Sequence, residues 1–167
     1  RLIASGMTKN KAIATLGIVS GMVMPLIFVP FAIITALSVV IVPNLSESYV
    51  LEKWSNIRDK VSKSILITSI TAFSTMALLI PLGYPLGMLL YNQPLAGNLI
   101  APISLFIIFM CLDNNLGSIL NGLGKQTRAA IHSTIGDVLQ LTCTYLLAAH
   151  PYFGIYGFVI GFVLNSI

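Results

Sequence analysis

Two aspartates, Asp113 and Asp137, lie within long apolar stretches of the sequence. A charged side chain at the centre of a bilayer costs roughly 2.5 kcal/mol or more, so an acid in such a stretch marks a candidate functional site. At about 1.5 Å per helical residue, Asp113 lies roughly 15 Å from a helix end at Leu123, and Asp137 lies roughly 14 Å from Arg128. Since the turn between the two helices is short, we expect both carboxylates near the membrane midplane.

Each aspartate belongs to a stripe of polar residues along one helical face. The first stripe is Asp113, Asn114, Gly117, Ser118 and Asn121, and the second is Ser133, Asp137, Gln140 and Thr144. If the stripes face a cavity or each other, the carboxylates are poorly solvated and repel each other, so at least one should hold a proton near neutral pH.

Three roles stay open for these side chains. Intramembrane polar residues often form hydrogen bonds that join helices, and this role requires no substrate. The same residues could instead line a cavity, or they could couple transport to protons or cations. The candidates for cavity lining or coupling are Asp113, Asn114, Asn121, Asp137 and Gln140.

The sequence lacks motifs for catalysis or for a cofactor. It contains no CxxC, HExxH, P-loop or GxSxG pattern. Cys111 and Cys143 lie in apolar runs, where a thiol behaves as a small hydrophobe. His132 and His150 fall near opposite ends of a hydrophobic stretch, at positions expected for membrane interfaces. We therefore expect neither an enzyme nor a protein with a metal site or cofactor.

The composition predicts an all-α integral membrane protein. Of the 167 residues, 56% are hydrophobic and 8% are charged, a balance that a soluble domain of this size could not bury. The net charge of +4 is typical of loops that orient a membrane protein. The expected partner is thus the lipid bilayer and not nucleic acid.

The pattern of apolar runs and turns predicts a bundle of about five spans, near residues 17–42, 64–82, 99–123, 128–149 and 152–167. Pro25 and Pro30 should break the first span, where they could form part of a cavity wall. Pro43 should end it, with Asn44 capping an amphipathic cytoplasmic linker over residues 45–63 that Trp54 anchors at the interface.

Basic residues gather in two alternate connections. One carries Lys53, Arg58, Lys60 and Lys63, and the other carries Lys125 and Arg128. The turns at 92–98 and 149–154 carry none, so both basic connections are expected on the cytoplasmic side. Lys125 and Arg128 are expected to contact lipid headgroups, with a lipid-linked pyrophosphate as the alternative ligand.

Two segments carry a family resemblance. The run ALSVVIVPNLSE at residues 36–47 and the run ILNGLGK at 119–125 are its most specific parts. With them, the chain resembles the polysaccharide biosynthesis and stage V sporulation protein B family, relatives of lipid II flippases in the multidrug and polysaccharide exporter superfamily. The resemblance covers nearly the whole chain and implies that residues 1–167 are part of the second six-helix lobe, partnered by the remaining lobe.

The resemblance implies a bacterial flippase of the cytoplasmic membrane that exports lipid-linked oligosaccharide or cell-wall polysaccharide precursors by alternating access. The chain departs from lipid II flippases because no charge lies between Lys11 and Glu47, where those relatives carry cavity charges. A cation-coupled exporter of small amphipathic molecules is therefore an alternative. A non-transporting assembly subunit is another, whereas the uncharged turns at 92–98 and 149–154 disfavour a membrane glycosyltransferase.

Overall fold

A computed structural model describes residues 9–147, and every regular element in this range is helical. The elements are α1 (Lys9–Ile18), a π-helical segment η1 (Val19–Val23), α2 (Met24–Ile27), α3 (Val29–Val50), α4 (Trp54–Tyr91), α5 (Pro94–Ser104), α6 (Ile107–Gly122) and α7 (Gln126–Leu147). The expected all-α membrane fold is confirmed. The predicted fifth span, at 152–167, and His150 lie outside the described residues.

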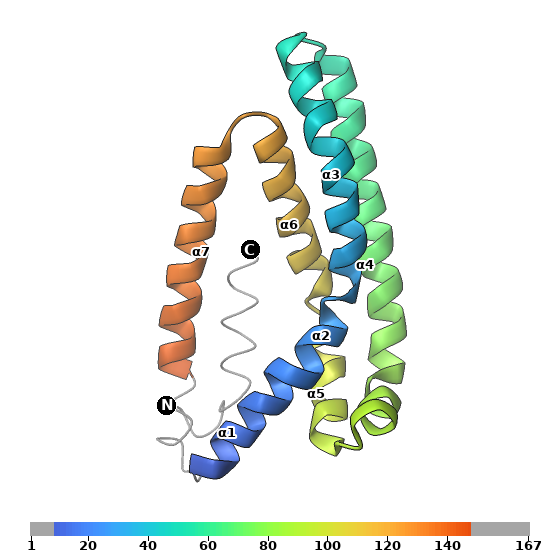
Figure 1. Ribbon diagram of the computed structural model, residues 1–167, viewed down its shortest axis with the longest axis vertical. Coiled ribbons are helices and arrows are strands. Elements are labelled where there is room, and N and C mark those ends of the chain that lie inside the picture. The colour runs from blue at the N-terminus through green and yellow to red at the C-terminus, as the bar shows by residue number, and fades with distance from the viewer. Residues whose placement is uncertain (1–8, 148–167) are drawn as a thin grey trace.

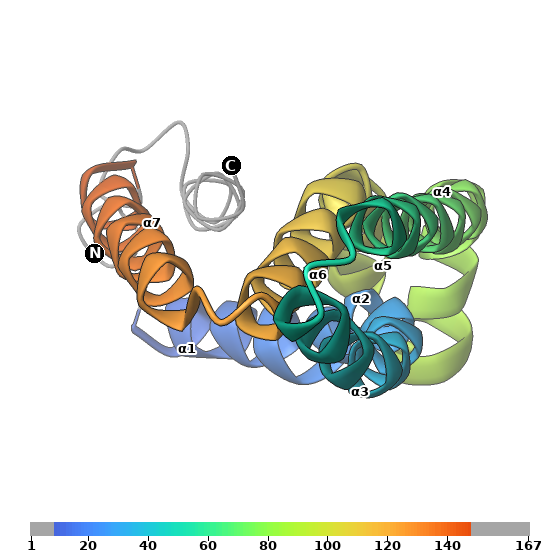
Figure 2. The same ribbon diagram turned by 90° about the horizontal axis from the view of Figure 1, so that it is seen from above.

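The helices are arranged as antiparallel pairs (Figure 1). Helices α3 and α4 lie side by side, α6 packs against both of them, and α7 runs back from the end of α6 on the side away from α4 (Figure 2). The α3–α4 and α6–α7 turns lie at the same end of the molecule. Both basic connections of the sequence therefore share one end, as their charge predicts.

Two described helices, α3 and α4, are long and apolar enough to cross a membrane. The pair α5 and α6, bent by 59°, makes a third if it is one broken span. Helix α7 has 22 residues but is not among the helices that are apolar enough. It covers most of the fourth span expected at 128–149, with a more polar composition than a lipid-exposed span usually has.

The first expected span is broken at its prolines. Pro25 stands in the first turn of α2, directly after the π-helical segment, and Pro30 stands in the first turn of α3. A proline fits there because its missing N–H would have no helical partner. Pro30 is buried in the core, whereas Pro25 is exposed.

The expected helix end at Pro43 is wrong. Helix α3 continues through Pro43 to Val50, and Asn44 does not cap a new helix. Its side-chain amide instead donates to the Val40 carbonyl, 2.8 Å away. Apolar packing of α3 on α4 and α6 thus outweighs the hydrogen bond that Pro43 removes.

The expected linker at 45–63 is divided between two long helices. Its first part completes α3, a short turn follows, and the remainder begins α4 at Trp54. Helix α4 then passes through Pro81 and Pro85 to Tyr91, so the end expected for the second span near residue 82 is also wrong. Neighbouring helices allow a proline inside such a helix when they pack against it.

The third expected span, 99–123, is two helices rather than one. The uncharged turn expected at 92–98 is confined to Asn92 and Gln93, because Pro94 already begins α5. Inside α5, Pro102 lacks an N–H, and the Ser104 hydroxyl donates to the Ala101 carbonyl at 2.7 Å. Both features weaken the backbone hydrogen bonding of α5 just before the 59° bend between α5 and α6.

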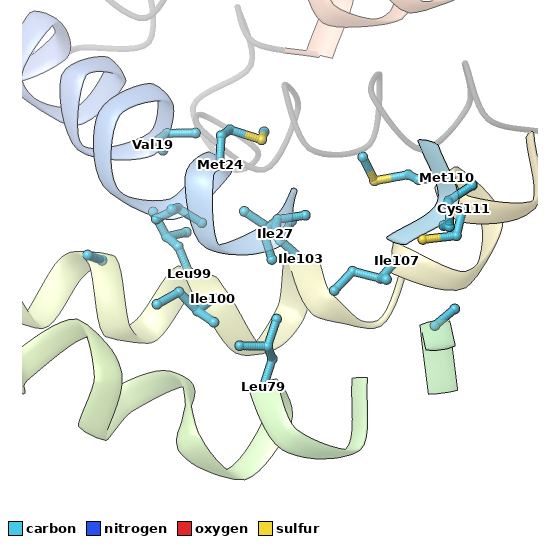
Figure 3. Packing of buried hydrophobic residues seen from close by; sticks show 14 residues of the cluster. Val19, Met24, Ile27, Leu79, Leu99, Ile100, Ile103, Ile107, Met110 and Cys111 are labelled. Carbon is cyan, nitrogen blue, oxygen red and sulfur yellow. The ribbon is translucent and has the colours of Figure 1, made fainter. Parts of the chain in front are cut away.

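The main core joins the N-terminal segments to α5 and α6 (Figure 3). Val19, Ile27, Leu99, Ile100 and Ile107 are each at most 2% exposed. A second apolar cluster, formed by Ile41, Leu45, Ile57 and Ile119, lies toward the end with the basic connections. These two clusters fix α6 against α3 and α4.

Helices α4 and α5 cross at glycines. A Cβ atom on Gly87 would overlap the backbone of Gly97, and one on Gly97 would lie 3.0 Å from the Cα atom of Tyr84. Such close approach lets the two backbones pack without intervening side chains, as small residues do in membrane helices.

We expect Gly87→Ala to destabilise the protein by about 1–3 kcal/mol, because the added methyl group overpacks the crossing. Gly17→Ala is the matched control, since nothing lies within 4 Å of a Cβ at Gly17. Alanine there should be neutral or stabilising by up to about 1 kcal/mol. Thermal unfolding of the detergent-solubilised protein measures both changes, and equal midpoints for the two variants would contradict the crossing.

Candidate functional site

Helix α6 packs one face against its neighbours through Cys111, Asn115, Ile119 and Gly122, which are all buried. The amide oxygen of Asn115 accepts a 2.8 Å hydrogen bond from the Ser64 hydroxyl of α4. Asn115 is 0% exposed, so this bond lies entirely inside the helix interface. Sequence reasoning missed Asn115, although its spacing of four from Cys111 and Ile119 places it on the apolar face.

Helix α3 also holds α6 through polar contacts. The Ser46 hydroxyl donates to the Gly122 carbonyl at 2.8 Å, and the Ser38 hydroxyl donates to that of Ser118 at 2.9 Å. A Cβ on Gly122 would lie 3.1 Å from Leu45, so the two helices are in close contact there. Hydrogen bonding between helices, one of the three roles considered for the polar stripe, therefore applies to Ser118.

The other face of α6 lines a pocket of about 890 Å³ against α7. Its polar lining residues are Asp113, Asn114, Ser118, Asn121, Gln126, His132 and Ser133. Gly117 also lines it, so the whole stripe predicted on α6 faces one space. Asp113, Asn114 and Asn121 are exposed and present a carboxylate and two amides to this pocket.

The pocket carries a single carboxylate among its described lining residues and no lysine or arginine. His132, expected only as an interfacial residue, lines the same pocket as Asp113. Apart from these two, the polar lining consists of neutral amides and hydroxyls. Such a surface can exchange hydrogen bonds with a polyhydroxylated ligand or coordinate a cation through oxygen atoms.

The structure does not place every predicted residue in this pocket. Asp137 and Gln140 belong to α7 but are not among the described lining residues, and neither are Pro25 and Pro30. The two aspartates are therefore not brought together in this pocket. Roles for Asp137 and Gln140 in transport, and for the prolines in a cavity wall, stay predictions.

Backbone hydrogen bonds fix the turn between α6 and α7. Gly124 has φ of +70°, the Lys125 N–H donates to the Leu120 carbonyl at 2.9 Å, and the Gly124 N–H donates to that of Asn121 at 3.1 Å. These two bonds form the Schellman motif that ends a helix at a glycine. Lys125 is exposed on this turn, and Arg128 is exposed in the first turn of α7. Their contact with headgroups stays a prediction.

The profile of the MatE family matches residues 1–146 of the chain. The chain belongs to the MatE family. Members of this family are transmembrane exporters rather than enzymes, which confirms the resemblance to the exporter superfamily and, at the level of the family, the absence of an enzymatic role.

A curated relative, "Sporulation protein YkvU" of Bacillus subtilis (strain 168), is 26% identical over 160 residues. The match covers 96% of this chain and 36% of the relative, so the chain spans about a third of that protein's length. No solved structure matches the chain significantly. Family and relative together point to a bacterial multi-pass membrane protein.

The adjacent residues Asn114 and Asn115 should differ sharply in accessibility. In a background lacking Cys111 and Cys143, we expect a water-soluble maleimide to label Asn114→Cys, which lines the pocket. Asn115→Cys should react at least about tenfold more slowly, because its site opens only when the helices separate. Labelling rates in membrane vesicles measure this, and equal rates would contradict the assignment of the two faces.

Proposed function

We propose that this chain forms part of a flippase that moves lipid-linked oligosaccharide or cell-wall polysaccharide precursors across the bacterial cytoplasmic membrane. The carrying observation is the α6–α7 pocket, whose lining combines Asp113 with amides and hydroxyls. Alternating access would expose this pocket to the two sides of the membrane in turn. Since the chain spans 36% of its relative, the transported path would also involve segments outside it.

The lining suits the hydroxyl groups of a saccharide. Asn114 and Asn121 each offer an amide donor and an amide acceptor, and Asp113 accepts hydrogen bonds from hydroxyls. A hydroxyl pairs with such groups without the desolvation of a full charge, which favours a neutral sugar in this space.

The charge distribution fits the amphiphilic character of a lipid-linked substrate. Lys125 on the α6–α7 turn and Arg128 in the first turn of α7 neighbour the pocket residues Gln126 and Ala129 in the chain. Cations there can attract the pyrophosphate that joins sugar to lipid, while the pocket itself receives the uncharged part. Sugar and phosphate would thus meet different parts of one site.

The test uses the full-length transporter in proteoliposomes loaded with a fluorescent lipid-linked oligosaccharide. We expect the combined Asn114→Ala and Asn121→Ala substitutions to slow its movement between leaflets about thirtyfold, since each of the two lost hydrogen bonds contributes about 1 kcal/mol. Lys63→Gln, a substitution of an exposed residue outside the pocket, should leave the rate unchanged. If the unmodified protein does not move the lipid-linked oligosaccharide between leaflets, the proposed substrate is wrong.

A second candidate is a cation-coupled exporter of small amphipathic molecules. The observation that favours it is the single carboxylate of Asp113 in a pocket whose described lining has no lysine or arginine. An unbalanced carboxylate attracts an inorganic cation or a cationic substrate.

Asp113→Asn distinguishes the two candidates, because it keeps hydrogen-bonding capacity but removes the charge. For a flippase of neutral sugars, we expect movement of the lipid-linked oligosaccharide to fall less than about fivefold, the loss of roughly one hydrogen bond. For a cation-coupled exporter, the variant should lose efflux driven by an ion gradient. Gradient-driven efflux of an organic cation by the unmodified protein, abolished in the variant, would favour the second candidate.

A further inference from the structure

A second hollow lies on the first turns of α4, at the end that carries the basic connections. It has a volume of about 540 Å³ and is lined by Trp54, Ile57, Arg58, Val61, Ser62 and Ile65. We name this hollow the α4 groove. It shares no lining residue with the α6–α7 pocket, so it is separate from the site of proposed transport.

The α4 groove runs from a polar mouth to an apolar floor. Trp54 lies nearest the α3–α4 turn, Ile57 and Arg58 follow one helical turn on, and Val61 and Ile65 lie farther along the same helical face. From Trp54 to Ile65 the helix rises roughly 16 Å, about the distance from a lipid headgroup to the upper part of its acyl chains. Arg58 therefore precedes Val61 and Ile65 along the groove, as the phosphate of a phospholipid precedes its acyl chains.

The apolar floor belongs to a packed part of the protein. Ile57 is 8% exposed, and Val61 and Ile65 pack against the same cluster as Leu123 of the α6–α7 turn. The floor is consequently rigid, and it borders the turn that also carries Lys125.

The aromatic mouth of the α4 groove is solvent-exposed. Trp54 is 62% exposed, and its ring stacks edge-on against Tyr49 of α3 with centroids 5.8 Å apart. This contact fixes the indole beside the groove instead of burying it. A tryptophan held at this level suits the interfacial region, where its apolar ring meets acyl chains and its N–H meets ester oxygens.

Arg58 supplies the charge. Lys60, in the second turn of α4, already has hydrogen-bond acceptors. Its ammonium donates to the Asn44 carbonyl at 3.0 Å and to the Ser48 hydroxyl at 2.8 Å. Arg58 is exposed within the groove, and no carboxylate is among the described lining residues. A guanidinium in this position can bind a phosphate through two parallel hydrogen bonds.

We propose that the α4 groove binds one anionic phospholipid from the surrounding bilayer, with its phosphate on Arg58 and an acyl chain on Ile57, Val61 and Ile65. The charge of Arg58, with no carboxylate among the described lining residues, favours an anionic headgroup over a zwitterionic one.

Trp54 is the only tryptophan of the 167-residue sequence and serves as the reporter. The full-length protein is reconstituted with brominated phosphatidylglycerol or brominated phosphatidylcholine, whose bromine atoms quench indole fluorescence on contact. A Trp54→Phe variant gives the background from any other tryptophan. We expect phosphatidylglycerol to occupy the groove about fivefold more tightly than phosphatidylcholine, the effect of one basic residue at an anionic surface.

Arg58→Gln should abolish this preference, whereas Arg58→Lys should retain part of it because the charge remains. Lys63→Gln is the matched control, since Lys63 is an exposed cation of the same helix that does not line the groove. Equal quenching by both lipids, or an unchanged preference in Arg58→Gln, would overturn the proposal.

The assay also separates a bilayer lipid from a transported one. Unlabelled phosphatidylglycerol should relieve the quenching at least as well as undecaprenyl pyrophosphate at equal mole fraction. Stronger relief by the pyrophosphate would assign the groove to a lipid-linked substrate and overturn its assignment to phospholipid. Because this readout involves no transport, it stands whether or not the proposed flippase activity is found.

Discussion

The position of the candidate site depends on the packing of one face of α6. Cys111, Asn115, Ile119 and Gly122 press this face against α3 and α4, and the Ser64–Asn115 hydrogen bond lies inside the contact. In a bilayer the hydrophobic effect does not drive helices together, so close packing and such hydrogen bonds must do so. With this face committed to the protein, the opposite face of α6 is left for the pocket.

Two neighbouring asparagines show how this division works. Asn115 is fully buried and bonds to Ser64, whereas Asn114 is exposed in the pocket. Their side chains differ by one residue of helical rotation, about 100°, and that rotation separates a structural role from a possible ligand contact. The turns of α6 that supply the polar groups of the pocket are therefore the same turns that pack against α3 and α4.

The sequence predicted the fold class and the polar stripe of α6, because composition and local periodicity are enough to predict both. It failed where tertiary packing overrides a local signal, as at Pro43 and Pro81, which both lie inside helices. The sequence also did not predict that Asp113 lines the pocket while Asp137 is not among its described lining residues. Helical spacing gives the depth of each acid but not how far α7 leans from α6.

The π-helical segment at Val19–Val23 has a consequence for the spacing of buried residues. Thr15, Val19, Val23 and Ile27 are buried at strict intervals of four. In an uninterrupted α-helix each such interval rotates by about 40° beyond a full turn, so this stripe would wind away from the core. The wider turn, with its i→i+5 bonds, takes up that excess rotation and keeps the four side chains in line. The spacing of four between these buried residues in the sequence therefore reflects the wider π-helical turn in the structure.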